Sequence, residues 1–204
     1  MENLVTLTVN STHFHLIQTG GGWLLFDVGW LNLLPQFLNR LKAYRIGLSE
    51  IKYIMFSHAH PDHADLVQTV RRLSGARLLI HASQVPRLAD LADFYKSNKN
   101  FEPITVGPAD LVSPDRAALH ALGIHGEMLE TPGHSDDSIS LVLNSGLAFT
   151  GDLVPPHLAT EEAHAITCQS WQKLARHGAE TIYPAHAEPF KMSAIRPYLV
   201  EECK

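Results

Sequence analysis

The chain carries, at residues 51–63, the segment Ile51-Lys52-Tyr53-Ile54-Met55-Phe56-Ser57-His58-Ala59-His60-Pro61-Asp62-His63. Residues 51–56 are mostly apolar, which is typical of a strand that is covered on both faces. His58 and His60 are two positions apart, so an extended backbone would direct both rings to the same side. Imidazole and carboxylate groups suit borderline divalent metals such as zinc. Taken singly, Asp62 could be a helix N-cap, but the clustered spacing favours a metal site at the end of this strand.

Three further segments follow the same pattern, in which a strand-like apolar segment stops at a residue able to bind metal. They cover residues 128–134, 147–152 and 181–186, and they end at His134, Asp152 and His186. Functional loops gather at the carboxyl ends of strands in α/β folds, so we expect these groups to meet at one edge. With the first cluster they supply five histidines and two aspartates, enough for two ions that share one carboxylate.

The rest of the chain alternates between strand-like and helix-like segments. Strands are predicted at residues 4–9, 13–17, 23–26, 51–56, 77–80, 125–131, 138–143, 146–150 and 181–183, and helices at 34–44, 66–73, 83–92 and 163–177. Residues 93–110 show no periodicity and are predicted to form a surface loop. The alternation predicts a layered α/β fold, and the lack of a linker-like segment predicts a single domain over residues 1–204.

Composition narrows the function classes. The 204 residues include 16 Lys and Arg against 21 Asp and Glu, for a formal charge of −5, which argues against a nucleic-acid partner. No apolar segment approaches the roughly 20 residues that span a bilayer, and the N-terminus lacks the features of a signal peptide. We therefore expect a cytoplasmic protein with a small-molecule substrate and no membrane partner, and the sequence leaves the oligomeric state open.

The two cysteines are far apart in the sequence and suggest no disulfide framework. Cys168 fits the periodicity of the helix predicted at 163–177, so we expect it in the core. Cys203 is expected in a frayed C-terminal tail.

The ordered motif His58-x-His60-x-Asp62-His63, followed by His134, Asp152 and His186, resembles that of the metallo-β-lactamase superfamily. The resemblance starts at Phe26-Asp27-Val28-Gly29 and implies an αββα four-layer sandwich. It implies that His58, His60 and His134 hold one metal, that Asp62, His63 and His186 hold the other, and that Asp152 bridges them. Asp27 matches a buried aspartate next to the site.

Within the family, Asp152 favours the glyoxalase II-like and lactonase-like branch. Tyr183-Pro184-Ala185-His186 resembles a glyoxalase II segment, but the sequence ends soon afterwards, which argues against a glutathione thioester. Ala64-Asp65 and Ser135-Asp136-Asp137 also depart from the usual flanking residues and make the substrate harder to predict.

We expect a dinuclear hydrolase in which a metal-bridging hydroxide attacks an ester, thioester or lactone carbonyl, with Asp62 as a ligand that also handles a proton. Two Zn²⁺ are the expected cofactors, with Mn²⁺ or Fe²⁺ as alternatives. Two other reactions stay open: an iron-dependent persulfide dioxygenase using His58, His134 and Asp152, and a phosphodiesterase of the same fold. Whether His157, Trp30, Phe94 or Tyr95 contacts the substrate also stays open.

Overall fold

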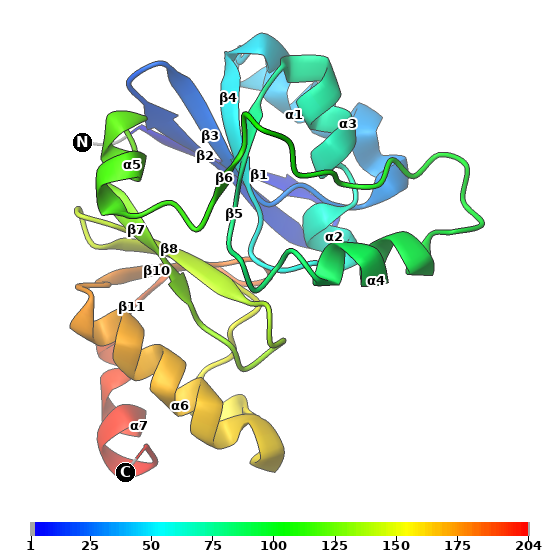
Figure 1. Cartoon of the computed structure of the whole chain (residues 1–204). Helices are drawn as coiled ribbons and strands as arrows, with labels where there is room; N and C mark the ends of the chain where they lie inside the picture. The colour runs from blue at the N-terminus through cyan, green and yellow to red at the C-terminus, as the bar shows by residue number, and fades with distance from the viewer. Residues whose placement is uncertain (1–2, 204) are drawn as a thin grey trace.

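Two β-sheets face each other in the computed structural model, which describes residues 3–203 (Figure 1). The first sheet has the strand order β1-β2-β3-β4-β5-β6. Its strands are β1 (Leu4–Val9), β2 (Thr12–Thr19), β3 (Gly22–Phe26), β4 (Ile51–Met55), β5 (Arg77–Ile80) and β6 (Leu111–Val112). β1, β2 and β3 pair antiparallel, and β3 to β6 pair parallel, so the sheet is mixed.

The second sheet has the order β11-β10-β9-β8-β7. Its strands are β7 (Gly126–Glu130), β8 (Ile139–Leu143), β9 (Leu147–Gly151), β10 (Thr181–Pro184) and β11 (Phe190–Lys191). β9 and β10 pair parallel and the other neighbours pair antiparallel. The carboxyl ends of β9 and β10 therefore point to the same edge of this sheet.

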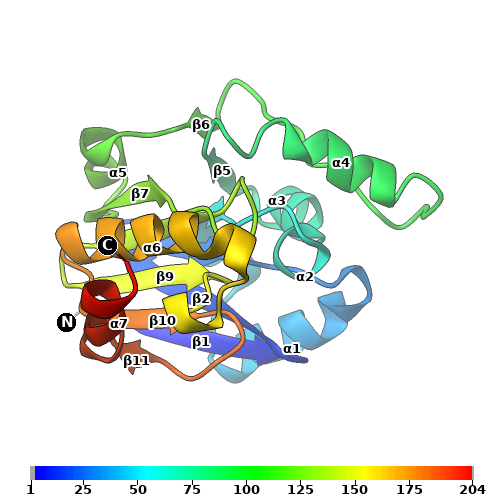
Figure 2. The ribbon, with the colours of Figure 1, turned by 90° about the horizontal axis from the view of Figure 1, so that it is seen from below.

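Helices cover the outer faces of both sheets (Figures 1 and 2). The α-helices are α1 (Leu34–Ala43), α2 (Pro61–Ala64), α3 (Val67–Ser74), α4 (Arg87–Phe94), α5 (Arg116–Ala121), α6 (Glu161–Arg176) and α7 (Arg196–Glu201). Short 3₁₀ turns lie at η1 (Leu31–Leu33), η2 (Leu48–Glu50), η3 (Pro156–Leu158) and η4 (Met192–Ala194). No helix among residues 3–203 is both long and apolar enough to cross a membrane.

Three apolar clusters correspond to the three interfaces between the layers. Phe37 of α1 and Val70 of α3 pack in the cluster that lies outside the first sheet. Phe26 and Phe149, from opposite sheets, share the cluster between them. Trp171 of α6 packs in the cluster outside the second sheet. Burial of apolar surface at these three interfaces holds the layers together. The order of helices, sheet, sheet and helices confirms the four-layer αββα sandwich that the family resemblance implies.

The shortest elements escape the sequence prediction. β6, α5, β11 and α7 were not predicted, since each has two to six residues and shows too little periodicity to be recognised. The helix predicted at 83–92 forms only from Arg87 onward and extends to Phe94. The expected loop is found over residues 95–110, which hold no helix or strand.

Cys168 is buried in the core as predicted, but the prediction of a frayed Cys203 and no disulfide is wrong. Cys168 of α6 and Cys203 form a disulfide across a sequence separation of 35 residues. Cys203 is buried rather than frayed, because the segment after α7 turns back onto α6. There the side-chain amide of Gln172 donates to the carbonyl of Cys203 at 2.8 Å. The spacing of the two cysteines in the sequence does not predict that the segment after α7 packs against α6.

Candidate metal centre

The predicted ligands lie in the segments that follow strands β4, β7, β9 and β10. His58 and His60 follow β4. Asp62 and His63 lie in the short helix α2, which begins at Pro61 directly after His60. His134, Asp152 and His186 follow β7, β9 and β10 respectively. Seven side chains that are distant in sequence therefore converge beside the two sheets.

Three imidazoles form what we call the first ligand group, which comprises His58, His60 and His134. His60 Nδ1 lies 2.9 Å from His58 Nε2 and 3.1 Å from His134 Nε2. His58 is buried, whereas His60 and His134 are exposed. Three ring nitrogens therefore lie close together, and two of their rings are open to solvent.

Two carboxylates and two imidazoles form the second ligand group, which comprises Asp62, His63, Asp152 and His186. Asp62 Oδ2 lies 3.2 Å from His63 Nε2 and 3.0 Å from His186 Nε2. Asp152 Oδ1 lies 3.3 Å from each of the same two nitrogens. Within each group, the candidate ligand atoms lie within 4.8 Å of one another.

Asp152 faces both groups. While its Oδ1 belongs to the second group, its Oδ2 lies 3.5 Å from His134 Nε2 and 3.9 Å from His58 Nε2. This is the placement that a carboxylate shared by two ions requires. The bridging role itself stays a prediction.

A buried aspartate supports the cluster from outside. Asp27 Oδ1 accepts a hydrogen bond from the backbone N–H of Ser57 at 2.6 Å, and Asp27 Oδ2 lies 3.0 Å from His63 Nδ1. Ser57 Oγ donates to Asp27 Oδ2 at 3.0 Å and also lies 3.0 Å from His58 Nδ1. An acceptor at Nδ1 keeps the proton there and leaves Nε2 free to bind a metal. Asp27 therefore orients His63 and does not belong to either ligand group.

Three supporting residues carry no signal in the sequence. The backbone carbonyl of Ser11 accepts from His186 Nδ1 at 2.8 Å, so it fixes that ring in the same way. The buried Asp137 accepts from the backbone N–H of Ala59 at 2.8 Å, between the two histidines of the motif. Gln84 Nε2 donates to the carbonyl of Phe56 at 2.8 Å, where the segment leaves β4. A carbonyl can come from any residue, and single Asp or Gln residues are too common to stand out.

Two glycines allow the segments to approach this closely. Gly151 has a φ of +56°, and a Cβ there would lie 2.4 Å from the side chain of Ser57. A Cβ on Gly29 would lie 1.9 Å from the backbone of Asp62. Any larger residue would push Asp152 or Asp62 away from the other ligands.

Burial and the neighbouring charges set the protonation of the second group. Burial lowers the pKa of His63, but the Asp27 carboxylate, together with Asp152 and Asp62, outweighs burial and raises that pKa well above its usual value. Burial raises the pKa of Asp62, but the neighbouring His63 ring outweighs burial and lowers that pKa to about 2. Asp62 is therefore an anion at neutral pH, as a metal ligand must be.

The donor set fits divalent cations. Among residues 3–203, the buried His63 Nε2 and Asp152 Oδ1 have no hydrogen-bond partner, although both point into the cluster. Buried polar atoms are normally paired, so a nitrogen and an oxygen left unpaired within one cluster of ligand-type side chains fit a role in binding a cation. Imidazole and carboxylate donors in this number suit zinc, manganese or iron.

An apolar pocket of about 390 Å³ adjoins the second ligand group. Besides His134, Asp152 and His186, its walls are formed by Gly151, Leu153, Val154, Pro155, Leu158, Pro184, Ala187 and Phe190. None of the four residues left open by the sequence lines it. Phe94 is exposed, and His157 stacks on Tyr198. Tyr95 donates to Asp65 at 2.6 Å, where burial raises the pKa of the carboxyl to about 6.

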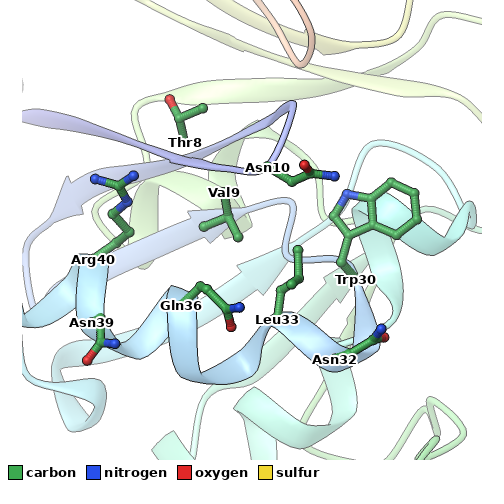
Figure 3. A pocket seen from close by; sticks show the side chains of 9 residues that line it. All are labelled: Thr8, Val9, Asn10, Trp30, Asn32, Leu33, Gln36, Asn39 and Arg40. Carbon is green, nitrogen blue, oxygen red and sulfur yellow. The ribbon is translucent and has the colours of Figure 1, made fainter.

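Trp30 lies in a different groove, of about 510 Å³, between the end of β1 and helix α1 (Figure 3). Its indole N–H donates to Thr12 Oγ1 at 3.1 Å, and side-chain amides and Arg40 line most of the groove. Its backbone N–H also donates to the carbonyl of Pro61 at 3.0 Å, next to Asp62. Trp30 thus braces the motif from outside and is not a wall of the apolar pocket.

Comparison with known proteins identifies relatives of the chain. A family model described as the Metallo-beta-lactamase superfamily matches residues 7–186. The chain is 28% identical to a Beta-lactamase-like protein 2 homolog of Caenorhabditis elegans over 185 residues, which are 88% of this chain and 57% of that protein. It is 25% identical to an Atrochrysone carboxyl ACP thioesterase of Aspergillus terreus over 192 residues, which are 91% of this chain and 52% of that protein. The chain thus spans a little over half the length of these curated relatives.

A solved structure supports the fold. A metallo-beta-lactamase family protein from Thermus thermophilus superposes with a TM-score of 0.71 at 20% identity, covering 98% of this chain and 78% of that one. The family match includes all seven residues of the two ligand groups. The chain belongs to the metallo-β-lactamase superfamily.

Proposed function

We propose that the chain is a metal-dependent hydrolase that binds two divalent cations and cleaves an ester, thioester or lactone. One observation carries the proposal: the two ligand groups meet at Asp152, whose Oδ1 and Oδ2 face different groups. The ligand types favour zinc, with manganese or iron as alternatives. Within the family we place the chain with the glyoxalase II-like and lactonase-like enzymes, because Asp152 is a carboxylate.

When bound, a pair of such ions lowers the pKa of a water molecule and polarises the oxygen of the substrate. Residues of the chain orient the side chains that would bind these ions. Asp27 and the Ser11 carbonyl orient His63 and His186 from outside. Asp62, an anion at neutral pH, would orient the attacking water and pass its proton onward. The exposed His60, His134 and His186 leave the centre open to a substrate.

An acyl substrate is favoured over a phosphodiester. The relative from Aspergillus terreus is named a thioesterase, and an apolar pocket adjoins the ligands. A phosphodiester would be favoured by cationic side chains, but within residues 3–203 none lines this pocket.

The deciding experiment measures metal content and activity together. Purified protein is analysed for bound metals and assayed with thioester, lactone, carboxylic ester, β-lactam and phosphodiester substrates. We expect close to two zinc or manganese ions per chain and acid release from at least one acyl substrate. Bound iron with oxygen uptake would identify the dioxygenase instead.

Asp62→Asn tests the proton role within that reaction. At saturating zinc, which compensates for the weaker amide ligand, we expect both ions to be bound and hydrolysis to stay reduced by about 100-fold or more, the usual range for loss of a general base. Full activity at the same metal content would contradict a proton role for Asp62.

A further inference from the structure

The apolar pocket next to the second ligand group is uncharged apart from the ligands themselves. Leu153, Val154, Pro155 and Leu158 form one wall, and Pro184 and Phe190 form the other. Its volume of about 390 Å³ is within the range of pockets that bury small ligands. A bound group there would touch Asp152 and His186 at one end and apolar carbons elsewhere.

The wall after β9 is held in place by other parts of the chain. Trp171 of α6 donates its indole N–H to the carbonyl of Val154 at 2.7 Å. His157, next to Leu158, stacks on Tyr198 of α7 with the ring centroids 4.0 Å apart. Because these contacts exist before any ligand binds, little ordering is needed when the pocket is filled.

Leu158, which lines this pocket, is unusually exposed for an apolar residue. Its side chain is 65% exposed, although it lines an apolar pocket and follows two rigid prolines. A bound apolar group could cover it.

The other side of the metal centre is polar. A hollow of about 300 Å³ next to His60 is lined by Arg87, Asp90 and Asp136. There Arg87 pairs with Asp90 at 2.9 Å and also with Asp136. An uncharged apolar group bound in this hollow would remove charged side chains from water without compensation. Such a group is therefore expected to bind in the apolar pocket instead.

We propose that the apolar pocket binds an uncharged alkyl arm of the substrate, and that Leu158 determines how strongly that arm is preferred. This inference rests on the proposed hydrolysis and adds the substrate class: a neutral ester or thioester with a medium-length apolar chain. The chain extends from the scissile carbonyl, beside Asp152 and His186, toward Leu158.

Two series of esters test the proposal on the metal-loaded protein. One series lengthens the acyl chain of methyl esters and the other lengthens the alcohol of acetate esters. In at least one series, kcat/KM should rise by about fourfold per methylene until the pocket is full. A flat response in both series, or a preference for charged chains, would overturn the proposal.

Leu158→Arg is the decisive variant, and Leu73→Arg is its control. Both leucines are exposed, at 65% and 45%, and Leu73 lies on α3, outside the pocket. Leu158→Arg should reduce the ratio of kcat/KM for long against short chains by about tenfold, and it should improve chains that end in a carboxylate. Leu73→Arg should leave the ratio unchanged. Equal ratios in both variants would show that Leu158 does not determine the preference for long chains.

A binding measurement separates this inference from the proposed function. Calorimetric titration with 2-decanone, an uncleavable ketone, is compared with 2-butanone. If no ester is cleaved but 2-decanone binds more tightly and Leu158→Arg weakens it, the hydrolase proposal fails and the pocket assignment stands. If esters are cleaved without length dependence and both ketones bind alike, the pocket assignment fails and the hydrolase proposal stands.

Discussion

The two ligand groups differ in how their rings are held. In the second group, each imidazole has a partner outside the group, since His63 Nδ1 contacts Asp27 and His186 Nδ1 donates to the Ser11 carbonyl. In the first group, His58 alone has such a partner among residues 3–203, the Ser57 hydroxyl. His60 Nδ1 faces His58 and His134 instead.

The groups also differ in charge and in exposure. The second group includes both carboxylates and has one exposed member, His186, while the first has only imidazoles of its own, two of them exposed. Carboxylate ligands and outer hydrogen bonds both raise metal affinity. We therefore expect the second group to hold its ion more tightly than the first.

Asp152→Ala should break the comparison, because Asp152 is the residue that faces both groups. We expect metal content to fall below one ion per chain at equal free zinc, and hydrolysis to fall by about 1000-fold. Mass spectrometry of metals and the acyl assay measure the two effects. Asp136→Ala removes an exposed aspartate that pairs with Arg87 and serves as the control. Retention of both ions in Asp152→Ala would refute a shared carboxylate.

Cys203→Ser should change stability without changing either group. The disulfide closes a loop over 35 positions, for which chain entropy gives at most about 3–4 kcal/mol of unfolding free energy. Urea unfolding of the variant, compared with reduced and oxidised wild type, measures the loss. Metal content should be unchanged in the folded variant. A fall in metal content would show that α7 and its contacts support the second group.

Asp27→Asn should weaken the second group selectively. Loss of the charge next to His63 Nδ1 is expected to reduce zinc affinity there by about 10- to 100-fold. Competition with a chromogenic chelator resolves the two binding steps. The first group should change by less than about threefold, since the variant keeps Ser57. If both steps weaken equally, Asp27 supports the whole centre.

His15→Gln tests acid stability away from both groups. Burial, with a smaller contribution from His13, lowers the pKa of His15 from 6.5 to about 3. Between these values the unfolded chain binds more protons than the folded one, so the wild type loses up to about 1.4 kcal/mol of stability per pH unit as pH falls. Relative to wild type, the variant should therefore gain about 2 kcal/mol on going from pH 7.5 to pH 5. Urea unfolding with a chelator present measures this, and parallel curves would contradict it.

Much of the centre was predictable because its chemistry depends on residue type and spacing. His58, His60, Asp62 and His63 lie in one segment, where strand geometry directs the first two rings to one side. His134, Asp152 and His186 each follow a strand and a small residue, so each could be predicted separately as a candidate ligand. Only the packing of the two sheets shows that they lie beside the first four.

The supporting contacts were not predictable. The Ser11 carbonyl reaches His186 across 175 residues of sequence, and a backbone acceptor has no residue type. Cys203 meets Cys168 because the segment after α7 lies against α6. The apolar pocket joins residues 153–158 to residues 184–190, which are ordinary apolar residues in each segment taken alone.

The donors, their order along the chain and the alternation of strands and helices can be predicted from the residues alone, because they depend on side-chain chemistry and local periodicity. Which imidazoles are held from outside, where the apolar pocket lies and where the cysteines meet become known only from the folded chain. Those properties depend on distances between segments, and such distances are set by how the two sheets pack.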